Sequence, residues 1–179
     1  DLASKVNGVS ALHTDLVKDT VFADLHRLHP DRIVNQTNGV TPRRWLRMSN
    51  PGLAQLLDDS IGEGWTTDLE QLRRLEPHAD DAAFREKLGE VKRANKVWLA
   101  DGLLADLGVK ADPDAIFDIQ VKRIHEYKRQ LLNILEAIAL WKRIHDDPNG
   151  DWTPRVKVFG GKAAPGYWLA KSVIHLIND

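Results

Sequence analysis

The sequence predicts an α/β fold in which a helix-rich first half precedes a parallel βαβα unit. Two short β-prone segments, residues 116–121 and 154–159, alternate with two amphipathic segments, residues 127–145 and 167–177. Alternation of strand and helix over about 60 residues is typical of parallel βαβ units, because a parallel strand needs a long crossover to return to the same end of the sheet. With 179 residues, the chain is long enough for a sizeable hydrophobic core.

The first half predicts several helices joined by short connections. Apolar residues recur at helical spacing over residues 9–28, 50–61, 68–75 and 80–107. The β-branched pair Thr20 and Val21 weakens the middle of the first of these helices. Residues 29–42 are rich in turn formers, so we expect a loop or a short strand there.

One face of each helix is expected to be buried. The residues expected on these faces are Leu12, Leu16, Val21, Phe22 and Leu25 in the first helix, Leu53, Leu56, Leu57 and Ile61 in the second, Phe84, Leu88, Val91, Val97, Trp98 and Leu104 in the long helix, and Leu131, Leu135, Ile138 and Trp141 after the first strand. Trp45 follows two arginines in a short polar element and could instead form a wall of a binding site.

Composition excludes several classes of protein. The formal net charge is −1, so no overall field favours nucleic acid or a membrane surface. The chain has no cysteine, which excludes disulfides and thiolate zinc sites, and no group of His, Asp and Glu has the spacing of a metal site. No apolar run approaches the roughly 18 residues of a membrane span. We therefore expect a cytoplasmic protein.

Both ends of the chain suggest an interior segment of a longer protein. The chain starts at Asp1 without an initiator methionine. It stops two residues after an apolar helical stripe, where an α/β domain is expected to continue into another strand.

A cluster of cations follows the first predicted strand. Lys122, Arg123 and Lys128 lie just beyond this strand, and a Gly-Gly-Lys turn at residues 160–162 lies just beyond the second. Ligands of open parallel sheets bind beyond the carboxyl ends of the strands. If the strands are neighbours, cations, a helix N-terminus and glycine amides converge in one crevice, which suits one or more phosphates.

Simpler interpretations of the same residues stay open. Lys128 and Arg129 could be solvated residues in the first turn of a helix, although the helix dipole disfavours cations there. His125 and Glu126 could form an acid–base pair, but adjacent residues do not face one another, so a structural or ligand-lining role is favoured.

Three long motifs resemble the α-glucan phosphorylase family. They are TNGVTPRRWL at residues 37–46, FDIQVKRIHEYKRQ at residues 117–130 and GGKAAPGY at residues 160–167. The spacing between them and the opening VNGV at residues 6–9 also match, so the resemblance covers nearly the whole chain.

The resemblance implies a fold and an activity. Members of this family are longer, two-domain enzymes of the two-Rossmann (GT-B-like) glycosyltransferase architecture. They carry pyridoxal 5'-phosphate and break down glycogen or starch, cleaving the terminal α-1,4 bond with inorganic phosphate and releasing glucose 1-phosphate with retention. By resemblance, residues 1–38 are the tail of the N-terminal domain, and residues 39–179 are the first part of the C-terminal, cofactor-binding domain. Full-length members are commonly homodimers, and allosteric control lies largely in the N-terminal region.

The resemblance also implies roles for individual residues. Asn38 matches the asparagine that binds the glucosyl unit, and Tyr127 a tyrosine near the sugar hydroxyls. The phosphate and cofactor residues are Trp45 in the cofactor pocket, Lys122 near the cofactor phosphate, Arg123 on the substrate phosphate and Lys128 between the two phosphates. His125, Glu126, Ala164 and Tyr167 correspond to the mouth of the active site, where planar inhibitors bind in some members.

In the family, the lysine that forms the Schiff base lies downstream of Asp179, and the glycine loop of the N-terminal domain lies upstream of Asp1. We therefore expect the isolated segment to be inactive. Two other functions stay open: a nucleotide-sugar glucosyltransferase such as a glycogen synthase, which shares the architecture, and a phosphate-binding module without enzymatic activity. The KRIHEYK run at residues 122–128 disfavours the synthase.

Overall fold

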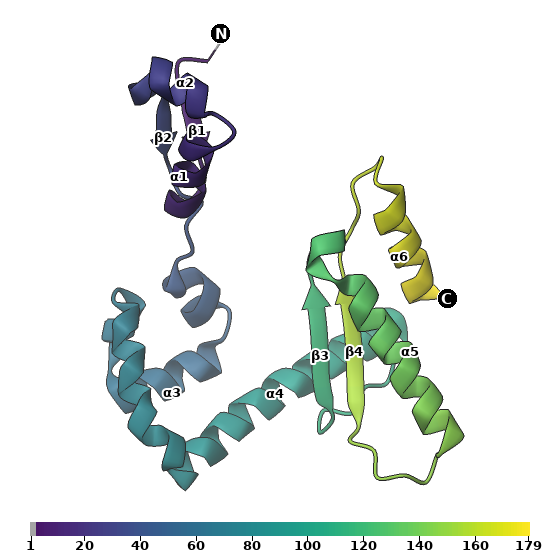
Figure 1. Ribbon diagram of the computed structural model, residues 1–179. Helices are drawn as coiled ribbons and strands as arrows, with labels where there is room; N and C mark the ends of the chain where they lie inside the picture. The colour runs from purple at the N-terminus through teal and green to yellow at the C-terminus, as the bar shows by residue number, and fades with distance from the viewer. Residues whose placement is uncertain (1–2) are drawn as a thin grey trace. The chain divides into compact units, whose positions relative to one another are not determined.

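The structure, a computed structural model, describes residues 3–179 and forms two compact units, Asp1–Arg85 and Glu86–Asp179 (Figure 1). It combines helices with parallel strand pairs, which confirms the predicted α/β class. Within the described residues, no helix is long and apolar enough to cross a membrane.

The first unit opens with a small βαβ motif. Its elements are β1 (Val6–Gly8), α1 (Ala11–Asp19), α2 (Ala23–Leu28), a 3-10 turn (Pro30–Arg32) and β2 (Ile33–Asn35). The two strands pair in parallel, with Val6 opposite Ile33. The side-chain amide of Asn35 donates to the carbonyl of Gly8 at 3.1 Å and to the hydroxyl of Thr14 at 2.9 Å. Polar contacts therefore join helix and strands.

The expected single helix over residues 9–28 is wrong in two respects. It breaks after Asp19, where the hydroxyl of Thr20 donates to the carbonyl of Leu16 and the backbone leaves the helical region. The buried residue of α1 is Thr14, whereas Leu12 and Leu16 are exposed. Val21 and Phe22 are exposed as well. Polar contacts rather than apolar periodicity decide which side of α1 faces the strands.

The rest of the first unit packs around one tryptophan. It contains a π-helical turn (Arg43–Met48), α3 (Pro51–Ile61) and two 3-10 helices (Glu63–Thr66 and Leu69–Asp80). Trp65 is fully buried against Ala54 and Leu57, and its indole N–H donates to Asp58 at 2.9 Å. The buried face predicted for α3 is confirmed at Leu56 and Leu57, which are buried, and Leu53 and Ile61 pack against the core.

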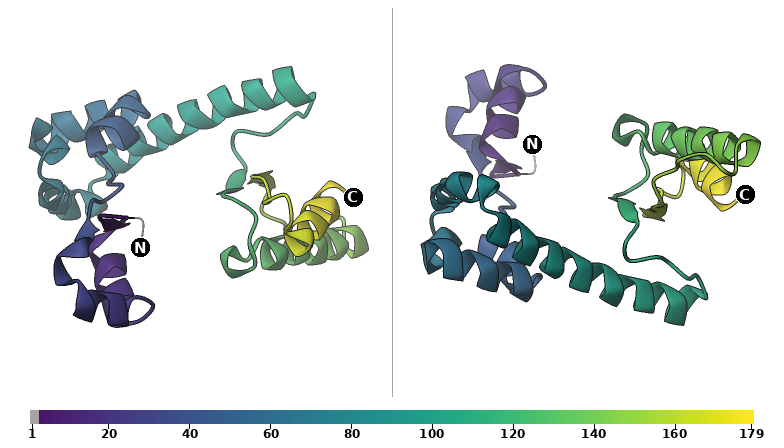
Figure 2. Two further views of the ribbon diagram at one scale, coloured as in Figure 1. Left: turned by 90° about the horizontal axis from the view of Figure 1, so that it is seen from above. Right: turned by 90° about the horizontal axis from the view of Figure 1, so that it is seen from below.

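The second unit contains most of α4 (Ala82–Leu107) and the predicted parallel unit. Its other elements are β3 (Ile116–Val121), a 3-10 turn (Glu126–Lys128), α5 (Gln130–Asp146), β4 (Arg155–Gly160) and α6 (Trp168–Asn178). The strands β3 and β4 pair in parallel from Ile116 opposite Arg155 to Val121 opposite Gly160. Helices α5 and α6 lie next to each other on the same side of this sheet (Figure 2). The predicted strand–helix–strand–helix order is confirmed.

Several residues predicted to be in the core of the second unit are exposed. Trp98 is 79% exposed and Trp141 67% exposed, and Leu104, Leu131, Leu135 and Ile138 are also exposed. The buried residue of α4 is Ala100. In α5, the polar residues Gln130 and Asn133 face the strands, since their side chains bond to β3 and the loop that follows it. The apolar stripe of α5, which starts at Leu131, lies on an adjacent side of the helix and is exposed to solvent.

The burial of Trp65 leads to a testable difference between two tryptophans. Replacing a buried tryptophan with alanine typically lowers stability by about 3–5 kcal/mol. We expect Trp65→Ala to lower the urea midpoint of the chain strongly, measured by circular dichroism. Trp98→Ala is the matched control, because Trp98 is exposed in this chain and its truncation should change stability by less than about 0.5 kcal/mol. Equal shifts for both variants would contradict this packing.

Candidate functional site

The loop after β3 lies directly beside the turn after β4. The backbone N–H of Lys122 donates to the carbonyl of Gly160 at 2.9 Å, and that of Ile124 donates to the carbonyl of Lys162 at 3.1 Å. Parallel pairing thus continues beyond the last strand residues. The structure therefore brings together the two strand ends that the sequence analysis singled out.

Gly161 makes this close approach possible. A Cβ atom at this position would lie 2.2 Å from the carbonyl oxygen of Lys122, a backbone atom that cannot move aside without disturbing the pairing. Glycine is used where one backbone must approach another this closely. The Gly-Gly turn, which matches no nucleotide-binding fingerprint, thus has a clear structural reason.

The loop after β3 carries three cations, Lys122, Arg123 and Lys128. Lys122 and Arg123 are exposed and Lys128 is half-buried. In the part of the chain that the structure describes, no ion pair joins any of the three to an acidic side chain. The ammonium group of Lys128 lies 5.1 Å from the ring centroid of Tyr127. Three unpaired cations within seven residues form a local positive site on a chain whose net charge is −1.

An aromatic cluster flanks the loop. The ring of His125 lies 4.7 Å from that of Tyr127 and 5.0 Å from that of Tyr167, measured between centroids. The hydroxyl of Tyr167 donates to the carboxylate of Glu126, and the backbone N–H of Glu126 donates to the same hydroxyl at 3.3 Å. Tyr167 thus contacts both residues, through its ring with His125 and through its hydroxyl with Glu126.

The contact with Glu126 raises the pKa of Tyr167 above its ordinary value. The hydrogen bond that the phenol donates to the carboxylate is the main cause, and partial burial adds to it. A neighbouring negative charge disfavours the phenolate. Tyr167 therefore stays protonated, and keeps its hydrogen bond, over a wider pH range than a free tyrosine.

A cavity of about 220 Å³ opens beside this cluster. It is lined by Ile124, His125, Glu126, Gln130, Leu131, Leu169, Ala170 and Val173. Ala164 lies in the turn before α6, where its carbonyl accepts a hydrogen bond from the backbone N–H of Tyr167 at 3.0 Å. The predicted mouth residues thus gather at the junction of the loop, α5 and α6.

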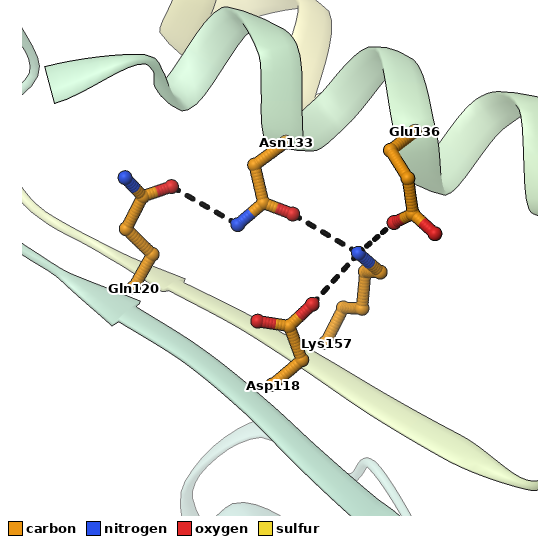
Figure 3. Close-up of polar contacts among 5 residues, drawn as sticks. All are labelled: Asp118, Gln120, Asn133, Glu136 and Lys157. Atoms are coloured by element: carbon orange, nitrogen blue, oxygen red, sulfur yellow. Dashed lines mark hydrogen bonds and ion pairs between the residues drawn. The ribbon is translucent and has the colours of Figure 1, made fainter.

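A polar network that the sequence analysis missed lies between the sheet and α5 (Figure 3). The ammonium group of Lys157 donates to Asp118 at 2.8 Å, to Asn133 at 3.0 Å and to the carboxylate of Glu136. Burial lowers the pKa of Lys157, but the hydrogen bonds to Asp118 and Glu136 outweigh it, so the pKa lies above its ordinary value. The sequence held one signal of this network: Asp118 and Gln120 alternate on an otherwise apolar strand.

The remaining predicted site residues lie in the first unit. Asn38 is exposed, and its backbone N–H donates to the carbonyl of Val9 at 3.0 Å. Trp45 lies in the π-helical turn and is 64% exposed. Each therefore has a side chain open to solvent in this chain. Among residues 3–179 there is no group of three or more His, Asp and Glu that could hold a metal ion.

Comparison with known proteins agrees with this arrangement of motifs. The sequence profile of the family described as carbohydrate phosphorylase matches residues 2–179. The chain belongs to the carbohydrate phosphorylase family. Glycogen phosphorylase from Haemophilus influenzae is 52% identical over 98% of the chain, and that of Synechocystis is 52% identical over 97%. The liver form of human glycogen phosphorylase is 50% identical over 97% of the chain.

The chain spans about a fifth of the length of these relatives, since it covers 21% of the Haemophilus protein and 20% of the other two. The predicted resemblance to glucan phosphorylases is thus confirmed.

The raised pKa of Tyr167 can be measured directly, because the chain has two tyrosines. In a Tyr127→Phe variant, we expect the remaining phenol to titrate above the ordinary value of about 10, as followed by the ultraviolet absorbance of the phenolate. Adding Glu126→Gln should move the titration down toward that value. A raised pKa in the folded chain stabilises it below the unfolded pKa, and this contribution is lost as the pH rises through the folded value. Identical titrations with and without the Glu126→Gln substitution would rule out the contact.

Proposed function

We propose that this chain is an interior segment of a pyridoxal-phosphate-dependent glucan phosphorylase, a glycosyltransferase. In this proposal the whole protein cleaves terminal α-1,4-glucosidic bonds with inorganic phosphate and releases glucose 1-phosphate with retention. The observation that carries the proposal is the cluster of Lys122, Arg123 and Lys128 at adjoining strand ends, without carboxylate partners in the described residues. The family of the chain is the second support.

The chemistry of the loop fits phosphate groups. Two phosphates, each with a charge of about −1.5 to −2 at neutral pH, repel strongly when they lie side by side. At an effective dielectric constant of about 20, each pair of unit like charges at about 4 Å costs about 4 kcal/mol. Three cations within one loop offset this repulsion. Arg123 suits the substrate phosphate, because its planar fork donates two parallel hydrogen bonds.

We assign the other residues from the resemblance to the glucan phosphorylase family. Lys122, Lys128 and Trp45 would hold pyridoxal 5'-phosphate, whose phosphate supplies a group with a second pKa of about 6 for proton transfer near neutral pH. Asn38 and Tyr127 would bind the glucosyl unit through its hydroxyls. The mouth of the site would be formed by His125, Glu126, Ala164 and Tyr167.

The proposal extends to the architecture of the whole protein. We propose that residues 1–38 end an N-terminal domain, that residues 39–179 open a C-terminal domain, and that both belong to a two-Rossmann architecture in a homodimer. The exposure of Trp98, Leu135 and Trp141 supports a larger protein, because apolar stripes of this kind are normally covered. The share of the relatives that the chain spans agrees with this.

The first test uses Arg123→Ala in the proposed full-length protein. Removing a bidentate contact to a phosphate that carries charge in the transition state should lower kcat/KM for phosphate about 100-fold. The measurement is glucose 1-phosphate release at varied phosphate and fixed glucan. Arg27→Ala is the control, since Arg27 is an exposed arginine that pairs with Asp24 on its own helix. A wild-type protein without phosphate-dependent release would contradict the proposed function.

The second test concerns the isolated chain. If the segment holds only part of the site, the 179-residue chain should release no glucose 1-phosphate from glucan and phosphate. Pyridoxal phosphate and phosphate should also leave its melting temperature nearly unchanged, since a ligand stabilises only in proportion to its affinity. Release of glucose 1-phosphate by the isolated chain would overturn this expectation. A phosphate-dependent rise in melting temperature that Arg123→Ala abolishes would instead favour an autonomous phosphate-binding module.

A further inference from the structure

The loop that carries the cations is tied down by a buried glutamine. Gln130, the first residue of α5, is 1% exposed. Its side-chain amide donates to the carbonyl of Arg123 at 3.1 Å, and its side-chain oxygen accepts from the backbone N–H of His125 at 3.3 Å. One of these partners can only accept and the other can only donate, so the amide has a single satisfied orientation. Gln130 thus holds the backbone on both sides of Ile124.

A second glutamine holds the other end of the loop. The side-chain amide of Gln120 donates to the carbonyl of Lys128 at 2.9 Å, and its oxygen accepts from Asn133 at 3.0 Å. The oxygen of Asn133 in turn accepts from Lys157 at 3.0 Å (Figure 3). An ammonium group can only donate, so Lys157 decides which way Asn133 points, and Asn133 decides which way Gln120 points. A chain of hydrogen bonds therefore runs from Lys157 to the backbone of Lys128.

A strained residue, Arg129, lies between Lys128, whose carbonyl is held, and Gln130. Arg129 has φ 61° and ψ 32°, and within the described residues it is the one non-glycine residue with positive φ. Such a conformation costs of order 1 kcal/mol or more and persists where the surrounding contacts enforce it. The turn at Arg129 leads from the held carbonyl of Lys128 into α5, where the side chain of Gln130 reaches back to Arg123.

We propose that Gln120 and Gln130 are positioning residues for the phosphate site: they fix the backbone of residues 123–128 and leave the charged ends of Arg123 and Lys128 free for phosphate. The proposal rests on the proposed function and adds to it two residues that touch no substrate. Its physical basis is preorganisation, because a site whose charged groups start from fixed backbone positions spends less binding energy on ordering them.

The test uses Gln130→Met in the proposed full-length protein. The methionine side chain is about as long as that of glutamine but makes neither hydrogen bond. We expect KM for phosphate to rise about tenfold and KM for glucan to change less than twofold. Gln120→Met, at a half-buried position, should raise KM for phosphate severalfold and serves if the first variant does not fold. The decisive measurement is a double-mutant cycle with Arg123→Ala. In that background Gln130→Met should add little, because the group it positions is gone. The same holds for Gln120→Met in a Lys128→Met background.

Leu57→Ala is the control for simple loss of stability, because Leu57 is 4% exposed and lies in the core of the first unit. It should lower the melting temperature and leave KM for phosphate unchanged. If the glutamine variants fold but leave KM for phosphate unchanged while Arg123→Ala lowers kcat/KM for phosphate, the positioning role is wrong and the proposed function stands. If Arg123→Ala also has no effect on phosphate kinetics, the proposed function itself fails. Full additivity in the double-mutant cycle would show a purely structural role.

Discussion

The parallel pairing of β3 with β4 is the interaction on which the second unit depends. Its register runs from Ile116 opposite Arg155 to Val121 opposite Gly160 and continues through the hydrogen bond from Lys122 to Gly160. Shifting the register by one residue would turn Asp118 and Gln120 to the opposite face of the sheet. It would also separate Gly161 from the Lys122 carbonyl. The same pairing therefore places both the cation loop and the polar network that supports it.

The network around Lys157 helps to specify this register. Lys157 stands opposite Asp118 on the neighbouring strand and bonds to it, to Asn133 and to Glu136. Apolar contacts tolerate small shifts, whereas a buried polar network is satisfied in one arrangement only. The side chain of Lys157 is only 14% exposed, so a shifted strand would leave a desolvated charge without partners. The network thus connects strand register to the backbone of the loop.

Local pattern was sufficient to predict the βαβα order, because strand and helix periodicity are properties of consecutive residues. It also located the cation cluster, since the ends of parallel strands meet at one edge. It was not sufficient to predict which residues are buried. Helical spacing places Trp141 and Leu135 on one face of α5, but whether that face is covered depends on chain segments elsewhere. Nor could it find the two glutamines, because an amide between a donor and an acceptor depends on distances fixed only by the fold.

The loop divides two tasks between backbone and side chains. Hydrogen bonds to the carbonyls of Arg123 and Lys128 hold the backbone, and no carboxylate in the described residues takes up the two charged ends. Had an acidic side chain held the loop by pairing with these cations, an incoming phosphate would have to displace it, and part of the attraction would be lost to that exchange. Neutral amides bind the backbone without competing for the charge. A loop built to concentrate positive charge is thus better held by glutamine than by glutamate.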